Sequence, residues 1–364
     1  FRWTDPKHCR GRHPRRHESR SGRSRMSVKQ PLYLAVSLDV EEEGLFGGRY
    51  ARRGFSTRNT ASLRALTPFC TMGVRPTLFC AHSVLADKTS HETLAWLRDE
   101  HHAEIGAHLH HWNTPPLALD GSEQILPDMA DSVPAAALSN DLFVAKLATL
   151  IEAGRAVQSA PLTSFRMGRW DLHRQHWPLL AAAGILCDAS VRPLHCATTP
   201  MQGPNHFDAP GTPYWVSVGD DRIFEVPLTV PPLVPQLPAL LRSVSGPAGK
   251  KIRASLKSWG ALALLPVYHP LWAMCAITKV FTARGVRVLS LTWHSSEMMP
   301  GGTPHLPDAT AVARFTRKVA DWLNWLHRHY SVRCVTMNEL RCELGPTAPT
   351  LLGKGDWTGE STSP

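Results

Sequence analysis

Two short stretches of this 364-residue chain carry residue types and spacings that could hold a metal ion. "SLDVEEEG" places Asp39 and Glu41 two residues apart, directly after an apolar run. "EIGAHLHHW" places His108 and His110 two residues apart after another apolar run, with His111 next. One carboxylate and two imidazoles are a sufficient protein ligand set for an open, zinc-type site with water in the remaining position. The second carboxylate could then act as a base toward that water.

The alternation of side chains in extended chain limits which of these residues can act together. Neighbouring side chains point to opposite sides of a strand, so the two members of the acidic pair share one side. The two histidines of "HLH" also share one side, and His111 opposes them. We therefore expect His110 rather than His111 to be the second imidazole ligand. The spacing leaves open whether Glu42 or Glu43 takes the place of Glu41.

Two further apolar runs end in residues with catalytic potential. "SFRMGRW" ends a run with Arg166, and "LTWHSSE" ends another with His294. Alone, such an arginine usually forms a structural ion pair, and such a histidine usually lies at the edge of a core. In a (β/α) barrel, however, chemistry is concentrated where strands end, because the following loops meet on one rim. Polar residues at four matching strand ends therefore favour an active site.

The elements that must position these residues alternate between strand-like and helix-like patterns. Strands are expected at residues 32–38, 77–85, 103–109, 162–168, 185–191, 223–230, 286–293 and 332–340. Helices are expected at residues 90–102, with Ser90 as N-cap, and at 139–157, 176–184 and 309–330. Repeated alternation implies parallel strands covered by helices. We predict an α/β fold, a single distorted (β/α) barrel of seven or eight strands, with insertions at 113–137 and 192–222.

Charge and composition divide the chain into a barrel and two tails. The formal charge is +10, but residues 1–25 contribute nine basic and two acidic side chains, a net +7. We expect these residues to be a basic disordered tail, upstream read-through or an expression remnant, ahead of Met26. The barrel would span residues 26–345, and residues 346–364 would form a loosely ordered tail. Because the basic charge lies outside the barrel, no nucleic-acid partner is expected.

Cysteine usage and hydropathy indicate a compartment. The eight cysteines show no CxxC spacing and several lie in apolar runs, which is typical of reduced thiols in a cytoplasmic protein. The most apolar segment, residues 259–281, is interrupted by Pro266, Pro270 and Lys279, so no transmembrane segment is expected. A buried or surface-seated helical hairpin, in peripheral contact with a membrane or a lipid-linked substrate, is the interpretation that we favour.

Five blocks, in order over about residues 32–340, resemble the polysaccharide deacetylase family (NodB-like, carbohydrate esterase family 4). They are "SLDVEEEG", "EIGAHLHHW", "SFRMGRW", "GILCDASVRP" and "LTWHSSEMMPGG". The resemblance implies a barrel of the polysaccharide deacetylase type. The "HSSE" stretch is similar to that of a branch of the family that is linked to surface polysaccharide biosynthesis. The implied roles are catalytic base for Asp39, base orientation for Arg166, general acid for His294, metal binding for Glu41, His108 and His110, and groove lining for Asp188.

Two departures from the family pattern concern the same end of the barrel. The family usually places its two metal-binding histidines four residues apart, but here that position is Trp112. The family's arginine is usually followed by proline and an aromatic residue, whereas Met167 and Gly168 follow here. Trp112 and Trp170 lie near the expected rim and could stack on sugar faces, with core packing as the alternative. For Trp293, inside a strand, core packing is expected.

The resemblance implies a hydrolase that removes an acetyl group, in the first place N-acetyl, from a sugar or polysaccharide precursor. One divalent metal ion is implied, in the first place Zn²⁺, with Co²⁺, Ni²⁺ or Mn²⁺ as alternatives. The substrate would be an acetylated glycan, in one version lipid-linked. Two other functions remain open: hydrolysis of a cyclic amide or imide, as by allantoinase-like enzymes of the same fold, and glycan binding without catalysis.

Overall fold

The computed structural model describes residues 30–117, 135–197 and 203–351, apart from the side chains of residues 257 and 258. The chain divides into two compact units, residues 1–30 and 31–364. All described residues except Gln30 belong to the second unit. The expected basic tail at residues 1–25 lies outside the described residues, as does most of the expected insertion at 113–137.

Ten strands in the described part of the chain form one sheet, ordered β10-β6-β7-β5-β4-β3-β2-β1-β8, with β9 also paired to β1. The strands are β1 (Leu32–Val40), β2 (Thr77–Ala81), β3 (Glu104–Leu109), β4 (Ser164–Met167), β5 (Cys187–Asp188), β6 (Tyr214–Val218), β7 (Asp221–Glu225), β8 (Val288–His294), β9 (Val332–Val335) and β10 (Thr350–Leu351). All pairs are parallel except the β6–β7 hairpin. The predicted α/β fold with a mainly parallel sheet is therefore confirmed.

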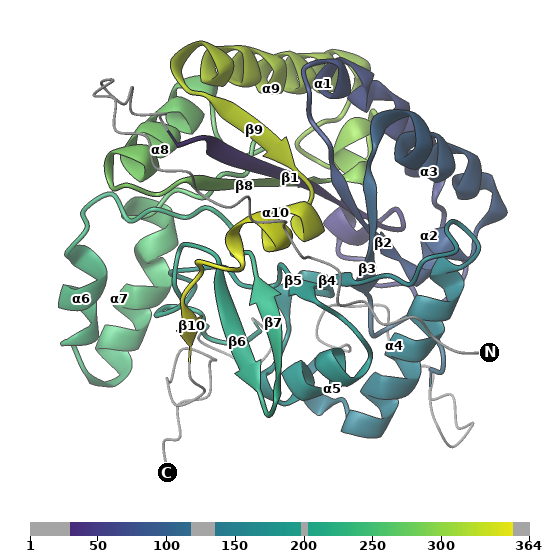
Figure 1. The fold of residues 1–364 in the computed structure, drawn as a ribbon, viewed down its shortest axis with the longest axis horizontal. Coiled ribbons are helices and arrows are strands. Elements are labelled where there is room, and N and C mark those ends of the chain that lie inside the picture. Colours follow the sequence, from purple (N-terminus) through teal and green to yellow (C-terminus); the bar gives the residue numbers. More distant parts are fainter. Residues whose placement is uncertain (1–29, 118–134, 198–202, 352–364) are drawn as a thin grey trace, which may run out of the picture. The chain divides into compact units, whose positions relative to one another are not determined.

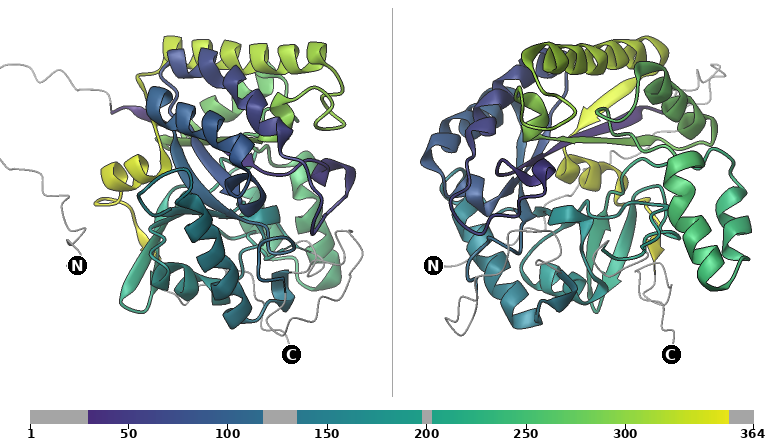
Figure 2. Two further views of the ribbon diagram at one scale, coloured as in Figure 1. Left: turned by 90° about the vertical axis from the view of Figure 1, so that its right-hand side faces the viewer. Right: turned by 180° about the vertical axis from the view of Figure 1, so that it is seen from behind.

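The strands run round a ring, with most helices on its outside (Figure 1). The helices are α1 (Thr67–Thr71), α2 (His82–Leu85), α3 (Lys88–His101), α4 (Asn140–Gly154), α5 (Trp177–Ala182), α6 (Leu237–Arg242), α7 (Gly246–Trp259), α8 (Leu271–Ala283), α9 (Ala309–His329) and α10 (Met337–Leu344). No ladder joins β8 to β10 in the residues described, so hydrogen bonds do not close the ring on that side. The view from behind shows α6 and α7 beside each other at one edge (Figure 2).

Several details differ from the expected elements. The strand expected at residues 332–340 ends at Val335, and helix α10 begins at Met337. Helix α3 begins at Lys88, and the side chain of Asp87 caps it by accepting a hydrogen bond from the backbone N–H of Thr89, so the prediction of Ser90 as N-cap is wrong. The hairpin strand β6 lies in the stretch expected to be an irregular insertion. Thr350 and Leu351, expected in the C-terminal tail, pair with β6. None of the described helices is long and apolar enough to cross a membrane.

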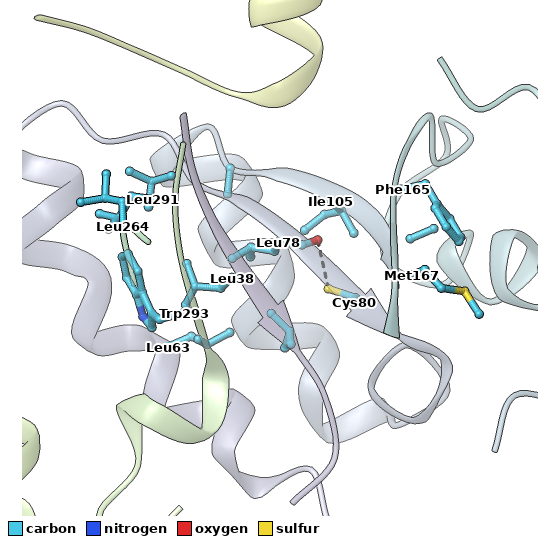
Figure 3. Packing of buried hydrophobic residues seen from close by; sticks show 14 of the residues in the cluster. Leu38, Leu63, Leu78, Cys80, Ile105, Phe165, Met167, Leu264, Leu291 and Trp293 are labelled. Carbon is cyan, nitrogen blue, oxygen red and sulfur yellow. Dashed lines mark hydrogen bonds between the residues drawn. The ribbon is translucent and has the colours of Figure 1, made fainter. Parts of the chain in front are cut away.

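Alternation along the strands separates an apolar outer face from an inner face that carries the polar residues together with a second apolar cluster, which includes Ala35, Phe79 and Val288. On β1, Leu34, Val36, Leu38 and Val40 all belong to the main core cluster, together with outward residues of β2, β3, β4 and β8. Figure 3 shows this layer, with Leu38, Leu78, Ile105, Phe165 and Trp293 among its residues. The intervening residues point into the ring. Trp293 is thus a core residue, as expected.

Candidate active site

The polar strand ends converge on one cavity of about 370 Å³. Asp39 and Glu41 reach it from the end of β1, His108 and His110 from β3, and His294 from β8. These strands are not all neighbours, so their side chains can meet only because they point into the ring. The alternation argument therefore predicted correctly which residues share the inner side.

Glu41, His108 and His110 form a cluster whose donor atoms lie within 4.8 Å of one another. The Oε2 atom of Glu41 lies 3.4 Å from Nε2 of His108 and 3.2 Å from Nε2 of His110. All three residues are buried. It is the one group of this kind among the residues that the structure describes, and His111 is not part of it.

Both imidazoles of this cluster are held at Nδ1, the ring nitrogen that does not face Glu41. His108 Nδ1 lies 3.0 Å from the carbonyl oxygen of Arg166, and His110 Nδ1 lies 2.9 Å from a carboxylate oxygen of Glu42. Each Nδ1 can therefore donate its proton, which leaves Nε2 facing Glu41. Two imidazole nitrogens and one carboxylate oxygen aimed at one point fit the donor preferences of a divalent transition metal such as Zn²⁺.

The charges around His110 favour a cation between these groups. Burial alone would lower the pKa of His110, but the carboxylates of Glu42 and Glu41 outweigh it and raise the pKa to about 10. For Glu41, burial acts to raise the pKa, and His294 with the two cluster histidines lowers it below its usual value. The two carboxylates therefore favour a cation at this place, which can be a proton on His110 or a metal ion that displaces it.

The guanidinium of Arg166 holds the carboxylate of Asp39 in place. Its Nη1 donates to Asp39 Oδ1 at 2.6 Å and to Thr292 at 2.9 Å, and its Nη2 donates to Ser37 at 2.9 Å. Its Nε donates to the carbonyl of Ala189 at 2.9 Å. Burial acts to raise the pKa of Asp39, but Arg166 and the nearby histidines outweigh it and keep that pKa below its usual value. Asp39 is thus ionised, and its other oxygen is not held by Arg166.

That second oxygen, Oδ2 of Asp39, faces two imidazoles. It lies 3.9 Å from Nε2 of His108 and 3.8 Å from Nε2 of His294. The backbone N–H of His294 donates to Glu297 at 2.9 Å, and its Nδ1 lies 3.4 Å from the same carboxylate oxygen. Burial lowers the pKa of His294, but Glu41, Glu297 and Asp39 outweigh it and raise that pKa to about 9. His294 therefore carries a proton at neutral pH and turns Nε2 toward the cavity.

Glu42 is a functional candidate that the sequence left undecided. It is buried and accepts hydrogen bonds from Asn113 Nδ2 at 2.7 Å, Ser83 Oγ at 2.7 Å and Trp112 Nε1 at 3.3 Å, in addition to its contact with His110. It does not replace Glu41 but holds the far side of the His110 ring. Glu43 lies apart from the cluster and accepts from Ser56 at 2.8 Å.

The two departures from the family pattern meet at His110. The Trp112 ring stacks on the His110 ring with centroids 4.2 Å apart and is 2% exposed, so it packs against the ligand set. Gly168 leaves room for that ring, because a Cβ there would lie 2.6 Å from His110 Cδ2 and 2.9 Å from the carbonyl oxygen of Leu109. The glycine after Met167 is thus a consequence of where His110 lies.

Backbone ties fix the ends of β1 and β8 together. Asn59 donates through Nδ2 to the carbonyl of Glu41 and to Ser295 Oγ, both at 2.9 Å, and the N–H of Glu41 donates to Ser295 at 3.2 Å. Nothing in the sequence near Asn59 indicated this role. By contrast, "HSSE" has the spacing of a capping box, with Glu297 three residues after His294, and that signal could have been recognised.

The remaining candidates fall in different places. Trp170 lines the cavity, as expected from the sequence. Arg169, Arg192 and His195 also line it, and these three were not identified from the sequence. Both Arg169 and Trp170 have φ near +60°, a conformation uncommon outside glycine. Asp188 is fully buried away from the cavity lining, where it accepts hydrogen bonds from Ser190 and shares one with Glu225. The structure therefore does not bring Asp188 to the site.

Comparison with solved structures finds similar folds at low sequence identity. No family model matches the chain, and no curated protein matches it in sequence. A "putative polysaccharide deacetylase from Mycobacterium smegmatis" superposes with a TM-score of 0.52 at 16% identity, over 90% of this chain and 96% of that one. A "putative glycoside hydrolase/deacetylase" from Parabacteroides distasonis gives 0.53 at 13%, over 85% and 69%. The 4-alpha-glucanotransferase from Thermococcus litoralis gives 0.53 at 12%, over 89% of this chain and 42% of that one.

Proposed function

We propose that this protein is a metal-dependent hydrolase that removes an acetyl group, in the first place N-acetyl, from a sugar or polysaccharide precursor. One observation carries the proposal. A single cavity brings together a carboxylate held by an arginine (Asp39 with Arg166), a carboxylate–imidazole cluster that fits a divalent ion, and the imidazole of His294, whose pKa the neighbouring carboxylates raise. Amide hydrolysis needs a base for the attacking water, an electrophile at the carbonyl and an acid for the leaving nitrogen.

Glu41, His108 and His110 would hold the ion, and we propose Zn²⁺ because two imidazoles and one carboxylate are ligands that it prefers. When bound, the ion supplies Lewis acidity to the acetyl carbonyl and to the attacking water. Asp39 accepts the proton of that water at Oδ2, since Arg166 occupies Oδ1 and keeps the carboxylate ionised. His294 delivers a proton from Nε2 to the leaving nitrogen while Glu297 fixes the other side of its ring.

The walls of the cavity support a sugar substrate. Trp170 and Tyr50 line it, and aromatic rings at a cavity wall can stack on the apolar faces of sugar rings. Of the two tryptophans expected to bind substrate, Trp170 is retained in this role. Trp112 is retained only through the edge that it presents to the cavity, because most of its surface packs on His110.

The proposal includes the setting in which such a substrate is met. Its finer form is a lipid-linked precursor in surface polysaccharide biosynthesis, deacetylated on the cytoplasmic side of a membrane by a peripherally bound enzyme. The sequence resemblance supports the biosynthetic role. All the cysteines in the described residues are free thiols, as expected in a reducing compartment.

The test is release of acetate by the purified, Zn²⁺-loaded protein from N-acetylated and O-acetylated oligosaccharides. Asp39→Asn keeps the shape of the side chain and the three proposed ligands but removes the base. We expect its rate to fall by about 10²–10⁴-fold. Asp141→Asn, an exposed carboxylate in the first turn of α4, is the matched control and should retain the parent rate.

Each outcome decides between functions. Acetate release that Asp39→Asn abolishes and Asp141→Asn keeps supports the proposal. Ring-opened product from a cyclic amide without acetate would replace it by the allantoinase-like alternative. Glycan binding that survives chelation, with no product from any substrate, would leave a binding protein.

A further inference from the structure

The exposed hydrophobic side chains of this protein gather in one part of the chain. Nine large hydrophobic residues are exposed in the described part, and seven of them lie within residues 233–272. They are Leu233, Val234, Leu240, Ile252, Trp259, Tyr268 and Trp272. Trp272 is 71% exposed and Trp259 is 50% exposed. Scattered exposed hydrophobic residues are ordinary, but a gathering of this kind marks an interaction surface.

The same stretch has an unusual charge distribution. Between Glu225 and Glu297 the sequence contains no aspartate or glutamate. It contains eight basic residues there: Arg242, Lys250, Lys251, Arg253, Lys257, Lys279, Arg284 and Arg287. Lys250 and Lys251 are exposed in the first turns of α7. Arg242 forms an ion pair with Asp208 from outside this stretch, so the positive charge there comes from the other basic residues, the exposed Lys250 and Lys251 among them. This part of the molecule is therefore both apolar and positively charged.

Helix packing and hydrogen bonds join the loop before α6, the end of α7 and the C-terminal end of α8. Helices α6 and α7 lie side by side outside the ring of strands (Figures 1 and 2). The N–H of Leu233 donates to the carbonyl of Gly260 at 2.8 Å, which ties the loop before α6 to the end of α7. Arg284, after α8, donates to the carbonyl of Leu233 at 3.4 Å. We call residues 233–272 the α6–α8 face.

On α7 itself the exposed apolar residues share one side. Ile252 and Trp259 are seven residues apart, which is two helical turns, and Ser255 lies between them on the same side. Trp259 Nε1 donates to Ser255 Oγ at 3.0 Å. A helix with exposed apolar residues on one side and lysines beside them has the pattern of helices that lie in the plane of a membrane surface.

We propose that the α6–α8 face docks onto the surface of a bilayer that contains anionic lipids. Tryptophan and tyrosine prefer the interface between lipid and water, because their rings are apolar and their N–H or O–H groups are polar. Basic residues are attracted to anionic headgroups. A protein partner would usually pair its own basic side chains with acidic side chains on the face that it binds. Residues 233–272 contain no acidic side chain.

The docking face is connected to the candidate active site. Cys196 Sγ contacts the carbonyl of Lys250 at 3.8 Å, so α7 packs on the segment that supplies Arg192 and His195 to the cavity. Docking would thus hold the cavity near the membrane. The inference specifies the membrane contact that the proposed function includes, but it does not depend on the proposed reaction, because binding to lipid is measured without a sugar substrate.

The experiment is cosedimentation of the full chain with vesicles, either phosphatidylcholine alone or equal parts phosphatidylcholine and phosphatidylglycerol. We expect binding to the mixed vesicles that weakens as salt is raised. Lys250→Gln/Lys251→Gln should lower the partition coefficient by about 25-fold, at about 5-fold for each charge. Trp259→Ser/Trp272→Ser should lower it by about 10-fold or more, since two large exposed side chains no longer enter the interface.

Matched controls and a competing source of binding make the test decisive. Val144→Ser and Lys88→Gln change an exposed apolar and an exposed basic residue elsewhere, and both should bind as the parent does. The basic residues 1–25 could also attract anionic vesicles. Binding that survives both double variants would come from that tail and would overturn the proposal, as would a parent that binds neither kind of vesicle. Unchanged thermal unfolding of each variant shows that folding is not the cause.

Discussion

Glu42→Gln should weaken metal binding while leaving the three proposed ligands in place. Gln has the same size as Glu, but it carries no charge and offers one acceptor oxygen where the carboxylate offers two. In the structure those two oxygens accept from His110, Trp112, Asn113 and Ser83. The substitution therefore leaves buried donors facing an amide N–H, and it removes the charge that makes the His110 ring a stronger base.

The magnitude follows from the loss of one such supporting partner. Substitution of a group that orients a metal-bound histidine typically costs about 10–100-fold in affinity, which corresponds to about 1.4–2.7 kcal/mol. We expect a loss in that range when Zn²⁺ affinity is measured by competition with a chromophoric chelator. Glu41→Gln, which removes a proposed ligand, should lose more.

The adjacent acidic residue supplies the matched control. Glu43 accepts from Ser56 and Arg58 at the surface and does not contact the cluster. Glu43→Gln should bind Zn²⁺ as the parent does. Parent-like affinity in Glu42→Gln, or an equal loss in Glu43→Gln, would refute the reasoning that a carboxylate behind His110 sets the metal affinity.

Three other substitutions test the structure around the site. Gly168→Ala should destabilise the fold by about 1–3 kcal/mol and displace His110, because its Cβ would lie 2.6 Å from the ring. Thermal unfolding and Zn²⁺ affinity measure the effect, and Gly47→Ala is the control, because a Cβ at Gly47 has no atom within 4 Å. Lys146→Met should lower the free energy of unfolding by about 2–3 kcal/mol, since Nζ donates at 2.6 Å to the carbonyls of Thr114 and Pro116; urea unfolding within about 0.5 kcal/mol of the parent would contradict it. Glu225→Gln tests pH dependence: burial and the neighbouring Asp188 raise the pKa of Glu225 well above its usual value, so its contribution to stability is present at low pH and is lost as pH rises toward the folded-state pKa. Gln mimics the protonated side chain, so the variant should gain stability over the parent as pH rises above about 4.3, the usual pKa of glutamate, and a constant difference would count against a protonated Glu225.

The residues that the sequence identified are those whose placement depends on a local rule. Alternation along a strand decides which side chains point inward, and it needs no knowledge of the neighbouring strands. Asp39 and Glu41, like His108 and His110, follow that rule, and the structure places both pairs at the cavity. The helix α9 was predictable for the same reason, because its apolar residues recur at helical spacing over 21 residues.

The residues that the sequence did not identify depend on contacts between distant segments. Asn59 acts through Ser295, which is 236 positions away, and only the pairing of β1 with β8 brings the two together. Asp188 shows the reverse case. It ends a strand as the others do, but β5 is only two residues long and its carboxylate turns to Ser190 and Glu225, so its place in the chain gave a misleading indication.

The need for Glu42 can itself be derived from where β3 ends. His108 lies inside β3 and pairs with Arg166 on β4, so a backbone carbonyl of the neighbouring strand is available to its Nδ1. His110 lies one residue beyond the end of β3, where that ladder has stopped. Its Nδ1 must therefore be held by a side chain, and Glu42, one residue beyond Glu41, supplies the carboxylate. Two consecutive acidic residues thus contact opposite nitrogens of one ring, and Glu42 takes the place at His110 that a strand carbonyl takes at His108.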